Sequence, residues 1–297
     1  MGTHDLSLGD IRNHCREKVR IVDHTLDDAQ LDARCPLDNG RHAVRPKTSV
    51  GQLDLLPAEL INQLLGILDI PTLTTFRRVN QRAMFLVDSL PPYRRLWMSC
   101  PSILRAVVSI NAASFSCETL FRTLTKEKCE SCSLFGGYYL YLITCKRVCY
   151  FCFTGRKEYF PVSLTLATRQ AKLPKMALRH LPQVLTLPGR YAPTAKLSTY
   201  RITLVDCQAL LQLSEEAEMM LNKRVDYKST EPRRYMSIVA APRLHLHDQT
   251  ADWWGLYCSL CRDNTEPSSH FRIQYSRQDI LQHFKDHHAS QIASPPT

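Results

Sequence analysis

Four of the twelve cysteines in this 297-residue chain form two C-x-x-C pairs with the spacing of metal ligands. The pairs are Cys129/Cys132 and Cys149/Cys152, and the sixteen residues between them fall in the window typical of structural zinc sites. Each pair can turn tightly and direct two thiolates at one ion, while Gly136-Gly137 and a strand over 138–144 return the second pair to the first. Four thiolates complete a tetrahedron and leave no position for water, so the spacing predicts a structural site rather than a catalytic one.

Cys145 makes this ligand set ambiguous, because it lies only four residues before Cys149. We leave Cys145 out because on the expected strand it shares a face with Tyr139, Tyr141 and Ile143, where a small core residue fits. The sequence alone leaves open whether Cys145 replaces one of the four ligands. Five buried free thiols are the other interpretation, and a redox pair is less favoured because no βαβ pattern surrounds the cysteines.

A second candidate metal set lies near the C-terminus and consists of Cys258, Cys261, His283 and His287. Twenty-one residues separate Cys261 from His283, and His287 follows His283 at i+4 on one helical face. His288 would lie about 100° further round the helix, so it is the alternative fourth ligand. The set resembles a two-Cys, two-His finger, but its spacing exceeds the twelve residues of DNA-reading fingers and its helix is nearly neutral, so we do not expect base recognition.

The remaining candidates are weaker. His245 and His247 alternate along a short strand and are interpreted as surface residues. Cys15 and Cys35 have no neighbour at metal spacing and are interpreted as incidental. Walker loops, glycine-rich dinucleotide turns, G-x-S-x-G and H-E-x-x-H motifs do not occur, so the sequence predicts no catalytic apparatus.

Residues 53–90 predict three short helices, and the rest of the chain is interpreted around them. In the first helix Leu60, Leu64, Ile67 and Leu68 recur on one apolar face after Pro57, which suits a first helical position. Asp69-Ile70-Pro71 separates it from a second helix, and Asn80 is the expected N-cap of the third. The second helix carries Leu73, Phe76 and Val79 on a shared side; the third turns Ala83, Met84 and Val87 inward and ends at Ser89–Pro92.

This stretch resembles the F-box, the module that docks cullin-based ubiquitin ligases. The match consists of Leu56, Pro57, Glu59, Leu60, Leu64, Leu68, Leu73 and Val79. The resemblance implies that a Skp-family adaptor binds Leu56, Pro57, Leu60, Leu64, Leu68, Leu73 and Val79. The alternative is an ordinary three-helix part of a larger helical domain.

The fold class that we predict is mixed and mainly helical. It comprises a disordered leader over 1–51, which lacks aromatic residues, an F-box over 52–98, and a helical and α+β region over 99–250. That region includes a zinc-ribbon-like hairpin over 126–155, and a finger-like unit over 251–289 and a disordered tail over 290–297 follow it. Within these parts we expect helices after Pro101, after Ser116, and over 161–173, 176–187 and 207–223, and strands over 200–205 and 235–240.

Composition limits the classes of partner. The formal net charge is +10, but the basic residues are scattered as isolated pairs, so nucleic-acid binding is not the favoured interpretation. No signal sequence or apolar run of about 20 residues occurs, so we expect a soluble protein in the reducing cytoplasm or nucleus, without a membrane partner. Cysteines in that compartment favour metal binding over disulfides.

Together, the F-box-like stretch and the cysteine-rich segment are similar to a group of fungal F-box proteins with a cysteine-rich second part. The resemblance implies a non-catalytic substrate receptor of a Skp–cullin–F-box ubiquitin ligase. It would bind the Skp adaptor and through it a cullin, an unidentified protein substrate, and one or two structural zinc ions. One alternative is a zinc-dependent nucleic-acid-binding or transcription-related protein; a RING-like ligase is another, although the two metal sets lie more than 100 residues apart.

Overall fold

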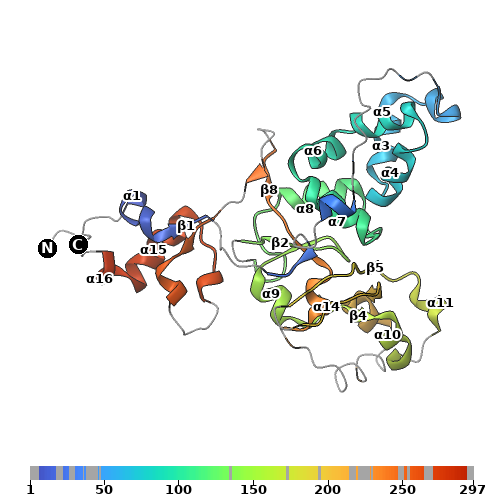
Figure 1. Ribbon diagram of the computed structural model, residues 1–297. Coiled ribbons are helices and arrows are strands. Elements are labelled where there is room, and N and C mark those ends of the chain that lie inside the picture. Colours follow the sequence, from blue (N-terminus) through green and yellow to red (C-terminus); the bar gives the residue numbers. More distant parts are fainter. Residues whose placement is uncertain are drawn as a thin grey trace.

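The computed structural model has a mixed fold, mainly helical, with small antiparallel sheets. It describes residues 7–17, 23–26, 31–35, 37, 46, 48–133, 136–171, 174–192, 195–213, 219, 228, 230–246, 251–252, 255–263 and 270–292. Figure 1 shows an elongated arrangement with α3, α4 and α5 at one end, the sheets in the middle, and α1 and α15 at the other end. The mixed, mainly helical class agrees with the sequence.

The helical end begins with a 3-10 turn, η3 (Gly51–Leu55), and continues through α3 (Ala58–Gly66), α4 (Ile70–Arg77), α5 (Gln81–Ser89), α6 (Pro91–Ser99), α7 (Pro101–Ser109) and α8 (Cys117–Thr125). Side-chain caps start three of these helices. Asp69 accepts the N–H of Thr72 at 2.8 Å, Asn80 that of Ala83 at 2.8 Å, and Ser116 that of Thr119 at 3.1 Å. The caps at Asn80 and Ser116 are those predicted.

Helix α6 was not predicted, because Pro91-Pro92 was interpreted only as the end of α5. Proline lacks an N–H, but the first turn of a helix does not need one, so the same two residues begin α6. The helix buries Tyr93 and Leu96 against its neighbours.

Two three-stranded antiparallel sheets occupy the middle of the molecule. In the first, β2 (Tyr139–Tyr141) lies between β3 (Lys146–Val148) and β7 (Ile238–Ala240). In the second, β6 (Thr203–Val205) lies between β4 (Val162–Ser163) and β5 (Gln183–Leu185). The connecting elements are α9 (Tyr150–Gly155), η4 (Lys157–Tyr159), α10 (Leu164–Ala171), α11 (Lys175–Leu178), α12 (Cys207–Leu213), α14 (Pro232–Tyr235), and the hairpin of β8 (Arg243–Leu244) with β9 (Ala251–Asp252).

Several expected elements differ from the structure. The helix expected over 161–173 begins only at Leu164, because Val162–Ser163 form β4 and pair with β6. The helix expected over 176–187 exists only as α11, because Pro182 favours an extended conformation before it and β5 pairs with β6 after it. The strand expected over 235–240 begins at Ile238, since α14 extends to Tyr235. The helix expected over 207–223 is seen as α12 to Leu213, and most of the remainder lies outside the described residues.

The helices and the first sheet share one core rather than two. Buried side chains of α4 to α8 form a continuous cluster with those of β2, β3 and α9, for example Leu104, Leu124, Leu140 and Phe153. The boundary expected near residue 98 therefore does not separate two hydrophobic cores.

Arg147 on β3 connects these parts through its side chain. Its guanidinium is fully buried and donates to five carbonyl oxygens: Gly137 at 2.6 Å, Pro242 at 2.7 Å, Thr123 and Leu124 at 3.1 Å, and Ala241 at 3.2 Å. Thr123 and Leu124 belong to the last turn of α8, where a positive charge is favourable. Arg147 thus joins α8 to the ribbon and to the segment after β7.

The N-terminal segment packs on the C-terminal unit. It contains α1 (Leu8–Ile11), η1 (Arg12–His14) and β1 (Cys15–Arg16); the unit contains β10 (Tyr257–Cys258), η5 (Leu260–Asp263), η6 (His270–Arg272), α15 (Arg277–His287) and α16 (Ala289–Ile292). Strand β1 pairs with β10, and Ile11 is fully buried with Ile280 and Phe284. Figure 1 shows the blue and red segments side by side.

Residues 1–51 are therefore not the uniformly disordered leader that the sequence led us to expect. Further described pieces contact the rest of the chain: Asp23 pairs with Arg272 at 2.6 Å, and α2 (Leu31–Arg34) lies against α7 through an Asp32–Arg105 ion pair of 2.9 Å. The lack of aromatic residues hid this packing, because its apolar contacts come from Ile11, Leu26 and Leu31.

Among the helices that the structure describes, none combines the length and the apolar character needed to cross a membrane.

Candidate metal centres

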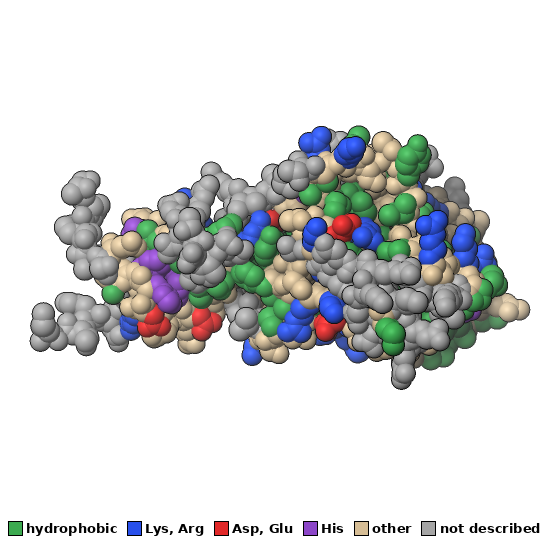
Figure 2. Space-filling model, turned by 90° about the horizontal axis from the view of Figure 1, so that it is seen from below, with side chains coloured by type: hydrophobic (Ala, Val, Ile, Leu, Met, Phe, Trp, Pro, Cys, Tyr) green, Lys and Arg blue, Asp and Glu red, His purple; other side chains and the backbone are tan. Residues whose placement is uncertain are grey.

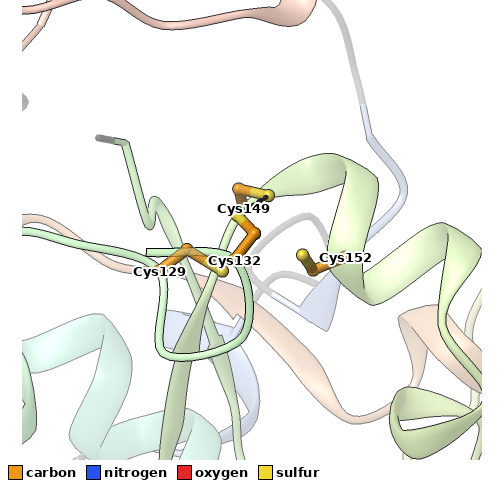
Figure 3. A group of neighbouring side chains, drawn as sticks. All are labelled: Cys129, Cys132, Cys149 and Cys152. Carbon is orange, nitrogen blue, oxygen red and sulfur yellow. Dashed lines mark hydrogen bonds between the residues drawn. The ribbon is translucent and has the colours of Figure 1, made fainter. Parts of the chain in front are cut away.

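The first cysteine set converges on one point. Cys129 and Cys132 lie on the loop after α8, Cys149 is the N-cap of α9, and Cys152 lies in the first turn of that helix. Figure 3 shows the four side chains pointing toward one another from these two segments. Their sulfur atoms lie within 4.8 Å of one another, and Cys132 Sγ is 3.8 Å from Cys149 Sγ. The structure thus brings together the four residues that the spacing selected.

This arrangement fits a tetrahedral ion. With metal–sulfur bonds of about 2.3 Å, the edges of a tetrahedron of sulfurs are about 3.8 Å long. The pKa of Cys129 lies well below its ordinary value because the Cys149 thiol donates to its sulfur and because backbone N–H groups of Cys132 and Ser131 point toward it. Such N–H groups stabilise a thiolate, which is the form that binds a metal.

Cys145 belongs to the core and not to this set. It is 3% exposed and has a backbone φ of 56°, and its carbonyl accepts a hydrogen bond from Thr123. Burial raises the pKa of its thiol to about 12, so Cys145 stays protonated at neutral pH. Leaving Cys145 out of the predicted ligand set agrees with this position.

The second set consists of Cys258, Cys261, His283 and His288, all of them buried. Cys258 ends β10, Cys261 lies in η5, and His283 is on α15. Cys261 Sγ is 3.3 Å from His283 Nε2 and 3.2 Å from His288 Nε2, so both imidazoles present the same type of nitrogen.

The fourth ligand position differs from the prediction: His288 completes the set, and His287 does not. His287 is the last residue of α15 and is exposed, whereas His288 is the C-cap, with φ −133° and ψ 17°. Because the chain leaves helical geometry at His288, the i+4 rule no longer decides which imidazole faces the cysteines. Figure 2 shows histidine side chains at the surface of this unit.

Neighbouring groups orient both histidines. His288 Nδ1 is 2.9 Å from Gln291 Oε1, so the Nδ1–H can donate there and leave the Nε2 lone pair for a metal. The ring of Tyr275 stacks on His283 with centroids 4.5 Å apart. Gln291 was not singled out in the sequence, because its role depends on the turn between α15 and α16.

The four weaker candidates, two histidines and two cysteines, are placed as follows. His247 lies outside the described residues, and His245 is in neither of the metal sets found among those described. Cys35 follows α2, while Cys15 lies in β1 directly opposite Cys258. Sequence spacing could not find this pairing, since it joins the two ends of the chain.

The residues implied as adaptor contacts divide into exposed and buried groups. On α3, Leu60 is 46% and Leu64 45% exposed; Val79 after α4 is 66% exposed, and Pro57 is also exposed. Leu56 and Leu68 are partly buried and pack against the main core. Leu73 is fully buried, so this position cannot contact a partner, and its implied role as an adaptor contact is wrong for this conformation.

Comparison of the chain with protein-family models, with curated proteins and with solved structures yields no match.

Proposed function

We propose that this protein is a substrate receptor of a Skp–cullin–F-box ubiquitin ligase, held in shape by two structural zinc ions. The proposal rests on the F-box-like sequence of residues 53–90 together with one structural observation, an uncovered apolar face on α3. The chain would supply proximity between adaptor and substrate, and other subunits would catalyse ubiquitin transfer.

The uncovered face is a row of large apolar side chains. Leu60 and Leu64 on α3 and Ile67 at its C-cap follow one another at helical spacing and are 46%, 45% and 67% exposed. About 100° further round the same helix, Ile61 and Leu65 are each 5% exposed and belong to the core. The helix therefore has two apolar faces. Packing against the protein's own core accounts for the buried face only, and the exposed face is left without a contact that explains its apolar residues.

Two further large apolar side chains of this stretch are exposed outside α3. Leu55 in η3 is 83% exposed and Val79 is 66% exposed. An adaptor helix could cover such a face as an amphipathic helix covers a groove. In place of the full set implied by the resemblance, the proposed contact residues are Leu55, Leu60, Leu64, Ile67 and Val79.

Zinc is the proposed ion because all eight donors are sulfur or imidazole nitrogen, which suit a tetrahedral structural site. The first set would fix the loop after α8 to α9, and the second would fix β10 and η5 to α15. Four protein ligands in each set leave no position for a substrate, which supports a structural role.

The adaptor interface is tested by binding a purified Skp-family adaptor to the full-length protein. Burying half of a leucine side chain contributes about 1 to 1.5 kcal/mol, so Leu60→Ala and Leu64→Ala should each weaken binding by roughly tenfold. Neither change should lower the melting temperature by more than a few degrees, because both side chains are already half exposed.

Two variants serve as controls. Leu65→Ala, on the buried side of α3, should lower the free energy of unfolding by about 2 to 5 kcal/mol while binding per folded molecule stays constant. Met176→Ala on α11 removes a large apolar side chain that is also exposed, at 63%, but lies outside the α3 face, and it should change neither quantity. If the wild-type protein does not bind the adaptor, or if Leu60→Ala and Leu64→Ala bind normally, the proposal is wrong.

A further inference from the structure

Cys15 lies opposite a metal-set cysteine in a strand pair that joins the two ends of the chain. In the β1–β10 pairing, Cys15 is the partner of Cys258 and Arg16 the partner of Tyr257. The Ser259 N–H donates to the His14 carbonyl at 2.8 Å, one position along the ladder. The Cys15 N–H donates to the Arg12 carbonyl of the same segment and not to β10.

These hydrogen bonds identify Cys15 and Cys258 as a non-hydrogen-bonded pair of an antiparallel ladder. In such pairs the Cα atoms are about 4.5 Å apart and the two side chains project from the same face. Disulfides form at Cα separations of about 4.4 to 6.8 Å, so the two residues can be joined without moving the backbone far. Both side chains also pack in the small core of the C-terminal unit.

The two sulfurs differ in environment. Cys258 is 3% exposed and belongs to the second metal set, whereas Cys15 is half-buried and lies outside that set. A small oxidant can therefore approach the pair from the side of Cys15. A cysteine in this place adds no ligand to the set, which Cys258, Cys261, His283 and His288 already complete.

We propose that Cys15 and Cys258 form a peroxide-responsive modification site in which a disulfide between them releases the metal of the second set. This inference rests on the proposed metal site. The Cys258 thiolate attacks one oxygen of hydrogen peroxide; an S–O bond forms, the O–O bond breaks, and hydroxide leaves. The Cys15 thiol then attacks the resulting sulfenic acid; an S–S bond forms, the S–O bond breaks, and water leaves with the thiol proton.

The two sulfurs together lose the two electrons that reduce the peroxide. A disulfide sulfur is no longer a thiolate, so the metal keeps only three ligands and its affinity falls. Release would loosen η5 and α15, while the new bond would keep the N-terminal segment attached to β10. Cross-strand disulfides with some exposure are readily reduced, so thiol reductant and fresh metal should restore the site.

The test uses the full-length protein purified with reductant, and metal content is measured first. After the reductant is removed, hydrogen peroxide is added in small molar excess, free thiols are alkylated, and tryptic peptides are mapped by mass spectrometry. We expect peptide 13–16 to be linked to peptide 244–262 through Cys258, together with the loss of one metal ion per chain. Adding a thiol reductant and zinc should return both to their starting state.

Before treatment, Cys15→Ser should contain as much metal as the wild type. After peroxide it should show no link between the two peptides, and reductant with zinc should no longer restore its metal content. Cys35→Ser is the matched control, because Cys35 is also half-buried in the N-terminal segment but has no opposite cysteine among the described residues; it should behave as the wild type. Two outcomes would overturn the inference. One is a Cys258–Cys261 disulfide together with Cys15 recovered as a free, alkylated thiol; the other is the absence of any disulfide under conditions that oxidise Cys35. A missing second ion before treatment would contradict the proposed metal site instead, and the peptide map would still decide whether the two thiols pair.

Discussion

Two adjacent histidines at the end of α15 differ in burial and in whether they belong to the second metal set. His288 is buried beside Cys261, and His287 is exposed to solvent. If both metal sets hold zinc, fresh wild-type protein should contain two ions per chain. His288→Ala should contain one ion, because three remaining ligands bind zinc too weakly to survive purification.

Elemental analysis of the folded variants measures this directly. His287→Ala is the matched control and should keep two ions, since it changes an exposed imidazole of the same helix that lies outside the metal set. The opposite pattern, with His287→Ala losing the ion, would restore the prediction from helical spacing.

Arg147 is the second residue whose role is decided by its contacts. Burial lowers the pKa of its guanidinium to about 10, so Arg147 is still charged at pH 7. Arg147→Met would leave up to five buried carbonyls without their donor, each at a cost of about 1 to 3 kcal/mol that entering water offsets in part. We expect the free energy of unfolding to fall by about 4 kcal/mol.

Denaturant unfolding measures this loss. Arg122→Met on α8 removes an arginine whose side chain is 73% exposed and pairs with Glu118, and this change should stay within about 0.5 kcal/mol. Equal effects of the two changes would mean that the carbonyls around Arg147 find other donors.

At the scale of elements, the first metal set holds a loop and a helix that belong to the common core. Cys132→Ser leaves three thiolates, and structural zinc binding contributes about 10 kcal/mol or more, close to the whole stability of a typical domain. The sheet of β3, β2 and β7 should therefore unfold together with α9. Because this sheet shares its core with α4 to α8, adaptor binding should weaken as well.

Hydrogen exchange across the chain reports which elements open. Cys145→Ala is the control, because it removes a buried thiol four residues from Cys149 but outside the metal set, and it should keep both ions. If the amides of α3 to α8 stay fully protected from exchange in Cys132→Ser, the helical end is stable without the first metal set.

The elements that the sequence predicted correctly are those whose signals are local. Asn80 and Ser116 cap helices through an N–H three residues away, and the two C-x-x-C pairs are joined by a short hairpin. Where a distant partner decides the structure, the prediction failed. Gln183–Leu185 is a strand because β6 lies beside it, and Pro91 begins a helix because α6 can bury Tyr93.

For the candidate sites too, local sequence signals gave correct predictions and distant contacts were missed. Six of the eight predicted ligands lie within C-x-x-C pairs, and spacing alone was sufficient to find them. The choice of His288 depends on where α15 ends, and the position of Cys15 depends on a strand pair between residues at opposite ends of the chain. Neither is encoded in a short window of sequence.

At the scale of the whole molecule, the N-terminal segment is a structural part of the C-terminal unit. Ile11 is fully buried against Ile280 and Phe284, so Ile11→Ala should lower the stability of this unit by about 2 to 4 kcal/mol. Amide exchange of α15 should accelerate accordingly, while exchange in α4 and α5 stays unchanged.

Leu8→Ala is the comparison, because Leu8 lies on the same short helix but is 37% exposed. It should have little effect on α15. Equal protection of α15 in wild type and Ile11→Ala would show that the C-terminal unit is stable without the N-terminal segment.

The pairing of β1 with β10 also sets the order in which the protein can mature on the ribosome. Residue 15 is synthesised well before residue 258, so the segment around β1 lacks its β10 partner while the intervening chain is made, roughly 10 to 50 s at ordinary translation rates. During that time Ile11 and Cys15 are exposed to the surroundings. A nascent-chain-binding chaperone that recognises short apolar segments would therefore have a long opportunity to bind the segment around β1, and its release would have to wait until β10 has been made.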